Sequence, residues 1–199
     1  SYNNSYRKVV YSDGKTGALP CPRDKQYWQN YMTRLGTTIA KLSLEKELQI
    51  DGLFLDTEDY GSRNRGFKNY SRKACFCDSC FSEFLLANGY RGENLPIADY
   101  AERKNWLDRN KLLDSYFAFQ ENEVESLASN FEENLHKINP SFLIGLYPSP
   151  LYPTADNWVR NSIARGLSTN GPPVLIFGTE SYSGGNWQQR TPDNPVKLY

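Results

Sequence analysis

The stretch IDGLFLDTEDYG, residues 50–61, sets an apolar run directly before three carboxylates, Asp56, Glu58 and Asp59. A continuous apolar run of this length is typical of a short strand that is covered on both faces, as in parallel sheets. Ligands of parallel β/α folds bind at the carboxyl ends of the strands. The stretch therefore predicts a buried strand whose last residues carry the chemistry of the protein.

Strand-like and helix-like patterns alternate along the rest of the chain. Helical spacing of apolar residues predicts helices over residues 24–48, 78–88, 100–138 and 155–166, and apolar runs predict strands over residues 142–148 and 173–182. Residues 7–12 are a candidate for one more strand. Strands that alternate with helices favour right-handed crossovers and a parallel sheet.

This pattern predicts an α/β fold, either a (β/α)₈ TIM barrel or a partial barrel with parallel strands and flanking helices. A closed barrel takes about 250 residues, and this chain has 199. We therefore expect residues 1–199 to be a single barrel domain and a fragment that lacks the first and last strands. If the chain is the whole protein, an open sheet or a partner subunit has to cover the sheet edges.

The acids at the end of the first clear strand are the main catalytic candidates. Strand side chains alternate, so Phe54, Asp56 and Glu58 share the face that points into a barrel. We expect a raised pKa for Glu58, because burial beside an aromatic ring and a second carboxylate both disfavour its charged form. A raised pKa suits a general acid. The alternative is an ion pair with Arg63 or Arg65 that only fixes the loop.

Glu180 ends another predicted strand and is the candidate partner of Glu58. Glycoside hydrolysis needs two carboxyl groups about 5 to 5.5 Å apart for retention, or about 6.5 to 9.5 Å apart for inversion. The two glutamates meet this requirement only if their strands face each other across a barrel mouth. Otherwise Glu180 binds substrate or takes part in a structural ion pair.

Four cysteines form the second chemical feature, and three of them lie in the stretch CFCDSC: Cys21, Cys75, Cys77 and Cys80. Three thiols within six residues cannot all pair with one another as disulfides, whereas four thiolates suit tetrahedral Zn²⁺. Such a site has no open position, so the metal would be structural. Disulfides and free thiols are the alternatives. We expect no organic cofactor.

Composition excludes several classes of function. Lys plus Arg and Asp plus Glu are 23 each, so the formal net charge is zero and no basic stripe predicts nucleic-acid binding. No apolar run approaches the roughly 20 residues of a membrane span.

His136 is the one histidine. It falls late in a predicted helix, where we expect a structural role.

Two short motifs resemble known families. The strand-ending Glu58, followed by C-x-C-x-x-C and preceded by Cys21, resembles the zinc cluster of glycoside hydrolase family 42 β-galactosidases. That resemblance implies a (β/α)₈ barrel, an acid/base role for Glu58 and zinc bound by the four cysteines. DGLFLDTE resembles, more weakly, the D-G-x-D-x-D-x-E motif of family 18 chitinases, with Phe54 in place of one Asp. There the resemblance implies that Glu58 protonates the leaving group and that Asp56 assists an N-acetyl nucleophile of the substrate.

We therefore expect a glycoside hydrolase that cleaves a poly- or oligosaccharide by carboxylic acid general acid/base catalysis. Glu58 would be the acid/base, tuned by Asp56, and Glu180 would be the nucleophile or a substrate ligand. Aromatic side chains stack on sugars, and the candidates are Tyr60, Tyr147, Tyr182 and Trp187. The alternative is a catalytically inactive carbohydrate-binding or structural protein. Further partners would be a second copy of the chain or its missing remainder, and we favour an extracellular or periplasmic location.

Overall fold

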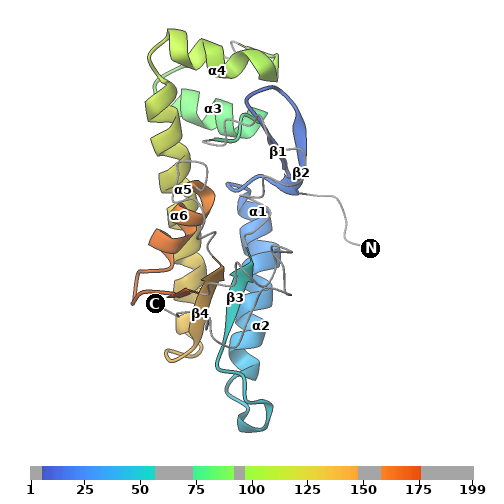
Figure 1. The fold of residues 1–199 in the computed structure, drawn as a ribbon, viewed down its shortest axis with the longest axis vertical. Coiled ribbons are helices and arrows are strands. Elements are labelled where there is room, and N and C mark those ends of the chain that lie inside the picture. The colour runs from blue at the N-terminus through green and yellow to red at the C-terminus, as the bar shows by residue number, and fades with distance from the viewer. Residues whose placement is uncertain (1–5, 57–73, 92–96, 148–157, 176–199) are drawn as a thin grey trace, which may run out of the picture.

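Two small sheets and one long helix organise the described part of the chain. The computed structural model describes residues 6–56, 74–91, 97–147 and 158–175 (Figure 1). Within these residues, β1 and β2 form an antiparallel sheet, and a parallel sheet has the order β3-β4-β5. The strands are Lys8–Val10 (β1), Thr16–Pro20 (β2), Gly52–Asp56 (β3), Leu143–Tyr147 (β4) and Val174–Leu175 (β5).

The first two strands form a hairpin. Its turn contains Gly14 at a φ of +82°, a conformation that glycine adopts without steric cost. The Tyr11 amide donates to the Lys15 carbonyl across the turn, at 2.9 Å. The strand predicted at residues 7–12 therefore exists, but it pairs with its hairpin neighbour and stays outside the parallel sheet.

The predicted first helix is built from three consecutive pieces. They are α1 (Lys25–Tyr27), the wider π-helix η1 (Trp28–Thr33) and α2 (Arg34–Leu42). The Asp24 carboxylate caps the start by accepting from the amides of Gln26 and Tyr27. The short 3₁₀ helix η2 (Lys46–Leu48) follows, and Gln49, at a φ of +49°, leads the chain toward β3.

The helix predicted over residues 100–138 is two helices in the structure. After α3 (Asp78–Ala87), the chain forms α4 (Tyr100–Arg109) and α5 (Leu113–His136). Between them Lys111 takes a φ of +57°, and the Leu112 amide donates to the Leu107 carbonyl at 2.8 Å. Across the described ranges, we find no helix that combines the length and apolar character needed to cross a membrane.

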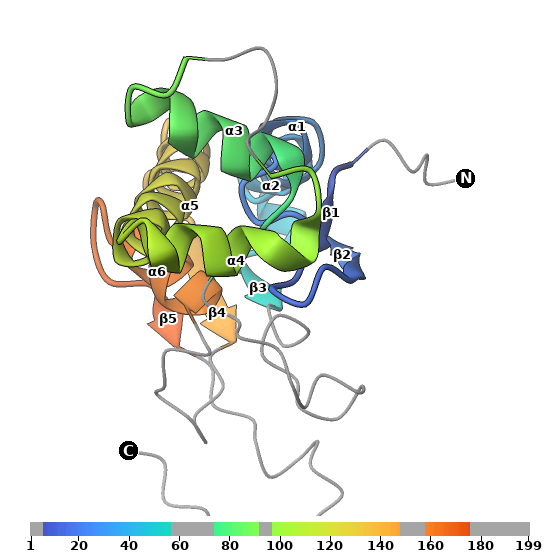
Figure 2. The same ribbon diagram turned by 90° about the horizontal axis from the view of Figure 1, so that it is seen from above.

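The parallel sheet has one covered face and one exposed face. Leu55, Ile144 and Leu146 are buried in a core with residues of α5 and α6 (Trp158–Gly166), and Figure 2 shows α2, α5 and α6 on one side of the strands. Strand register puts Phe54, Gly145 and Val174 on the opposite face. Phe54 is 53% exposed there and Val174 46%. The expectation that both faces are buried is wrong.

The predicted (β/α)₈ barrel is wrong as well. The described residues contain one two-stranded and one three-stranded sheet, and these do not close into a barrel. The fold is instead mixed α/β, with three strands in the part of the parallel sheet that the structure describes. The physical reason is that β1 pairs with β2 and that Val10 also bonds the Cys75–Phe76 segment, so the hairpin adds no strand to the parallel sheet.

Two hydrophobic cores lie along α5 (Figure 1). The first, which we call the cysteine core, joins the hairpin, α3 and α4, and it includes the four cysteines, Phe81, Leu107 and Tyr116. The second, the sheet core, includes Leu55, Ile144, Trp158 and Phe131. Tyr116 and Phe131 both belong to α5, so this helix contributes to both cores.

Candidate metal centre

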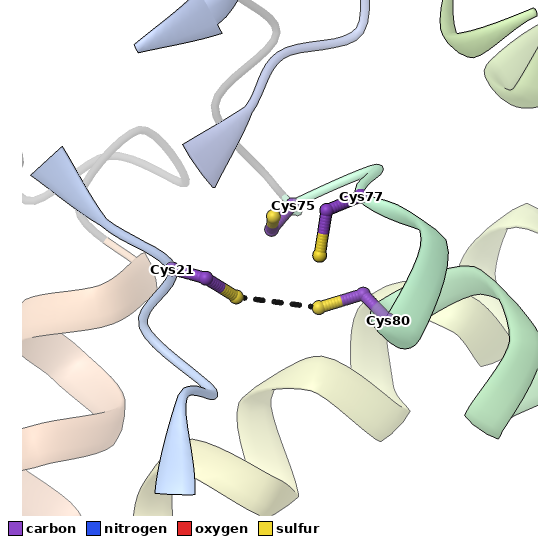
Figure 3. Close-up of side chains that lie close together, drawn as sticks. All are labelled: Cys21, Cys75, Cys77 and Cys80. Atoms are coloured by element: carbon purple, nitrogen blue, oxygen red, sulfur yellow. Dashed lines mark hydrogen bonds between the residues drawn. The ribbon is translucent and has the colours of Figure 1, made fainter. Parts of the chain in front are cut away.

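The four cysteine side chains meet in the cysteine core. Their Sγ atoms all lie within 4.8 Å of one another, and all four residues are buried. The Sγ atoms of Cys21 and Cys80 are 3.4 Å apart, and a dashed line joins them in Figure 3. None of the four forms a disulfide. The structure therefore brings together four thiols that are separated by up to 59 residues in sequence.

Local backbone geometry aims the thiols at one point. Cys21 directly follows β2, and its amide donates to the Arg7 carbonyl at 2.6 Å. Cys77 is the N-cap of α3 and Cys80 lies in the first turn of that helix. The Phe76 amide donates to the Val10 carbonyl of β1 at 2.8 Å, which ties the CFCDSC stretch to the hairpin. Two separate segments thus face each other across the cluster (Figure 3).

The backbone of Cys75 is held from α5. The Tyr116 hydroxyl and the Gln120 amide group both donate to the Cys75 carbonyl, at 2.6 and 3.2 Å. The Cys75 amide donates in return to the Gln120 side-chain oxygen, at 3.4 Å. Tyr116 and Gln120 are fully buried, so these bonds form away from water. They fix the position of one thiol relative to the long helix.

The segment around Cys77 is held from α4 by Arg103. This arginine is fully buried and donates to the Phe76 carbonyl at 2.7 Å and to the Asp78 carboxylate at 2.5 Å. Its guanidinium also lies over the ring of Phe81, 4.9 Å from the centroid. Both residues that flank Cys77 are therefore bound by the same side chain.

The thiols influence one another electrostatically. Hydrogen bonds from Cys21, Cys75 and Cys80 lower the pKa of Cys77 far below that of an ordinary thiol. Hydrogen bonds with the other three thiols raise the pKa of Cys21. The pKa of Cys75 is raised mainly by burial, with a further contribution from Cys77 and Cys80. The cluster thus favours a thiolate at Cys77 that its neighbours stabilise, and thiolate is the form that binds metals.

The donor set fits a closed site of the zinc type. Four sulfur ligands without a position for water or substrate are typical of structural Zn²⁺. One sulfur has an additional donor, because the Val10 amide hydrogen-bonds the Cys75 Sγ at 3.4 Å. Such N–H···S bonds orient a ligand and stabilise its negative charge.

The predicted acid and sugar-binding residues are placed only in part. Asp56 ends β3, is exposed, and lines a cavity of about 290 Å³ together with Tyr27, Tyr31 and Phe54. The backbone of Tyr147 ends β4 directly opposite Asp56 in the register. The remaining candidates lie outside the described residues: Glu58, Glu180, Tyr60, Tyr182 and Trp187.

Reasoning from the sequence missed Arg23 and Arg7, which lie beside the cysteines. Arg23 is buried, and its charge interacts with Cys80. Arg7 interacts electrostatically with Cys21, Cys80 and Cys77. The only sequence signal was that Arg23 follows Cys21 by two positions, in the stretch CPRD.

Comparisons with known proteins give no relative. No protein-family model matches the chain, no curated protein is similar to it at a significant level, and no solved structure matches it. Together with the small sheets, this overturns the membership of a glycoside hydrolase barrel family that the DGLFLDTE and C-x-C-x-x-C motifs implied. The chemistry of this chain has to be argued from its own residues.

Proposed function

We propose that this chain binds one Zn²⁺ ion through Cys21, Cys75, Cys77 and Cys80, and that the ion is structural. The observation that supports this most directly is the set of four buried Sγ atoms within 4.8 Å of one another. Zn–S bonds of about 2.3 Å in a tetrahedron place sulfur atoms about 3.8 Å apart. The observed separations, 3.4 Å for the Cys21–Cys80 pair and at most 4.8 Å for all pairs, bracket that value.

A structural role follows from where the ligands come from. Cys21 belongs to the segment after the hairpin, and the other three belong to the start of α3. An ion bound between them cross-links segments that are far apart in the chain, and its binding free energy becomes folding free energy. The cluster is buried, so a substrate has no direct access to the metal.

Metal analysis of the purified chain tests the proposal. We expect about one zinc per chain, and we expect Co²⁺ to give intense sulfur-to-metal charge-transfer absorption. Replacing both Cys77 and Cys80 with serine removes two thiolates and should abolish stoichiometric binding. Ser79→Ala is the matched control, since it changes a hydroxyl between these two cysteines on the same turn of α3 and should leave binding intact. A wild-type chain that folds fully and binds neither ion would refute the proposal. Iron found in place of zinc would contradict the identity of the metal.

We propose carbohydrate hydrolysis as a second function, at the carboxyl ends of β3 and β4. Its support is the cavity beside Asp56, where the rings of Tyr27 and Tyr31 stack at 5.4 Å. Flat aromatic faces next to a carboxylate suit sugar binding. Glu58 and Glu180 remain the proposed acid/base and nucleophile or substrate ligand, and the cysteine site would keep a structural role.

Hydrolysis of a panel of aryl glycosides tests this second function. Glu58→Gln should lower kcat by about 100-fold or more if the carboxyl group is a general acid. Glu47→Gln changes an exposed glutamate on η2 in the same way and should leave the rate unchanged. Equal rates in the two variants would refute hydrolysis by Glu58. Sugar binding without hydrolysis would favour the inactive carbohydrate-binding alternative.

A further inference from the structure

We infer that Arg23 completes the metal centre from outside the four ligands, by donating N–H···S hydrogen bonds to Cys80 and balancing the negative charge of the bound site. This inference rests on the proposed metal binding. It assigns Arg23 as a positioning residue, because the guanidinium would act on the metal through a sulfur ligand. Arg7 would support it by fixing the segment that carries both Cys21 and Arg23.

The hydrogen bonds of Arg23 leave two of its nitrogen atoms available. The side chain is 1% exposed. Its Nη2 atom bonds to Glu83 at 2.7 Å and to Glu123 at 3.2 Å, while Nε and Nη1 have no hydrogen-bond partner among the described residues. Buried donors in proteins are nearly always paired, so each exception needs an explanation. Arg23 already reaches α3 at Glu83, three residues after Cys80 on that helix, and the partner that we infer is a thiolate at Cys80.

The electrostatic surroundings of Arg23 agree with this geometry. Burial alone would lower the pKa of Arg23, but Cys80 and Glu83 hold it above its ordinary value. Arg7 shows the same balance, with burial opposed by Cys21, Cys80 and Cys77. Both arginines therefore lie in the negative field of the thiol cluster.

The bound site would need this positive charge. Zn²⁺ with four thiolates has a net charge of −2, and a buried charge is unfavourable unless it is paired and hydrogen-bonded. Arg23 is the more effective of the two cations, because its side chain is buried whereas that of Arg7 is 30% exposed. Arg7 holds the same segment, since its Nη2 donates to the Arg23 carbonyl at 2.9 Å.

Two sulfur atoms would then be supported in different ways. Cys75 accepts from the backbone amide of Val10, a donor that mutation of a side chain does not remove. Cys80 would depend on the guanidinium of Arg23. Loss of an N–H···S donor leaves the sulfur more electron-rich, so a variant at Arg23 should change the spectrum of a bound metal as well as its affinity.

Co²⁺ and Zn²⁺ titrations of four proteins test the inference: wild type, Arg23→Met, Arg23→Lys and Arg165→Met. Removing a group that supports a ligand typically weakens metal binding by about 10- to 100-fold, and we expect this for Arg23→Met. Arg23→Lys keeps the charge and should recover part of the affinity. Arg165 is the matched control, because it pairs with two glutamates of α5 from α6, and its loss should leave metal affinity unchanged.

The Co²⁺ charge-transfer band separates this role from a general loss of stability. We expect the band to move to lower energy in Arg23→Met, because the sulfur of Cys80 loses a donor. If Arg23→Met does not fold, the band of Arg23→Lys decides, and a band identical to wild type overturns the inference. A wild-type protein that binds no metal refutes the proposed function itself, whereas a metal-binding wild type with unchanged Arg23 variants refutes only the role of Arg23.

Discussion

Gly166 sets how closely α6 approaches α5. A Cβ atom at this position would lie 2.6 Å from the Cβ of Ala128 and 2.9 Å from the amide nitrogen of Ser129. Both distances are shorter than van der Waals contact. The Ser129 nitrogen belongs to the backbone of α5, so it cannot move aside as a flexible side chain would. A side chain here would push the two helices apart and open the sheet core around Ile163.

We therefore expect Gly166→Ala to destabilise the fold by about 1 to 3 kcal/mol, the usual cost of overpacking. Urea denaturation followed by circular dichroism measures the change. Gly171→Ala is the control, since a Cβ there meets nothing within 4 Å. Equal stability of the two variants would mean that α6 does not pack on α5 as closely as described.

At the scale of elements, His136 and Glu132 join the end of α5 to the segments around it. The His136 ring contacts the Glu132 carboxylate through Nδ1 and the Phe142 carbonyl through Nε2, the latter at 2.9 Å. Glu132 is fully buried and also accepts from the Asn170 side chain at 2.8 Å. These contacts tie α5 to the segment before β4 and to the segment after α6, and they give the structural role predicted for His136 a physical basis.

His136→Ala should destabilise the protein by about 1 to 3 kcal/mol, because it removes a hydrogen-bond partner from a buried carboxylate. Thermal unfolding at neutral pH measures the effect. Lys137→Ala is the neighbouring control. Its ion pair with Glu133 is exposed and should contribute less than about 1 kcal/mol. A His136 variant as stable as the Lys137 variant would show that Glu132 is satisfied by Asn170 alone.

At the scale of the whole molecule, α5 contributes to two cores of different character. The sheet core is held by apolar contacts between the parallel strands and α5 and α6. The cysteine core contains the four thiols, which repel one another as thiolates unless a cation lies between them. The two cores should therefore respond differently when metal is removed.

Chelation of the bound metal should increase amide hydrogen exchange mainly in β1, β2, α3 and α4. Exchange in β3, β4 and the second half of α5 should change much less, because cooperative units with separate packing can open independently. Hydrogen-exchange mass spectrometry with and without chelator makes the comparison. Uniform loss of protection would show that the cores unfold as one unit, and an unchanged pattern would contradict a structural role for the metal.

The agreement between sequence and structure depends on how local each signal is. Apolar runs and helical spacing predicted β3, β4, α3 and most of α5, because burial patterns act within a few residues. The break at Lys111 was missed, because neither glycine nor proline marks it. The β1–β2 hairpin was missed too, although Asp13 and Gly14 form a known turn signal.

The sequence by itself put three cysteines within six residues, in CFCDSC, and made Cys21 the candidate fourth member of one cluster. It also predicted a parallel sheet with Asp56 at a strand end, and β3 and β4 do pair in parallel. Only the tertiary structure decided that the strands of the described residues form two small sheets, and that Arg23, Arg103 and Tyr116 lie around the cysteines. Sheet closure and the surroundings of a buried site depend on contacts between distant segments, and no local pattern in the chain encodes those contacts.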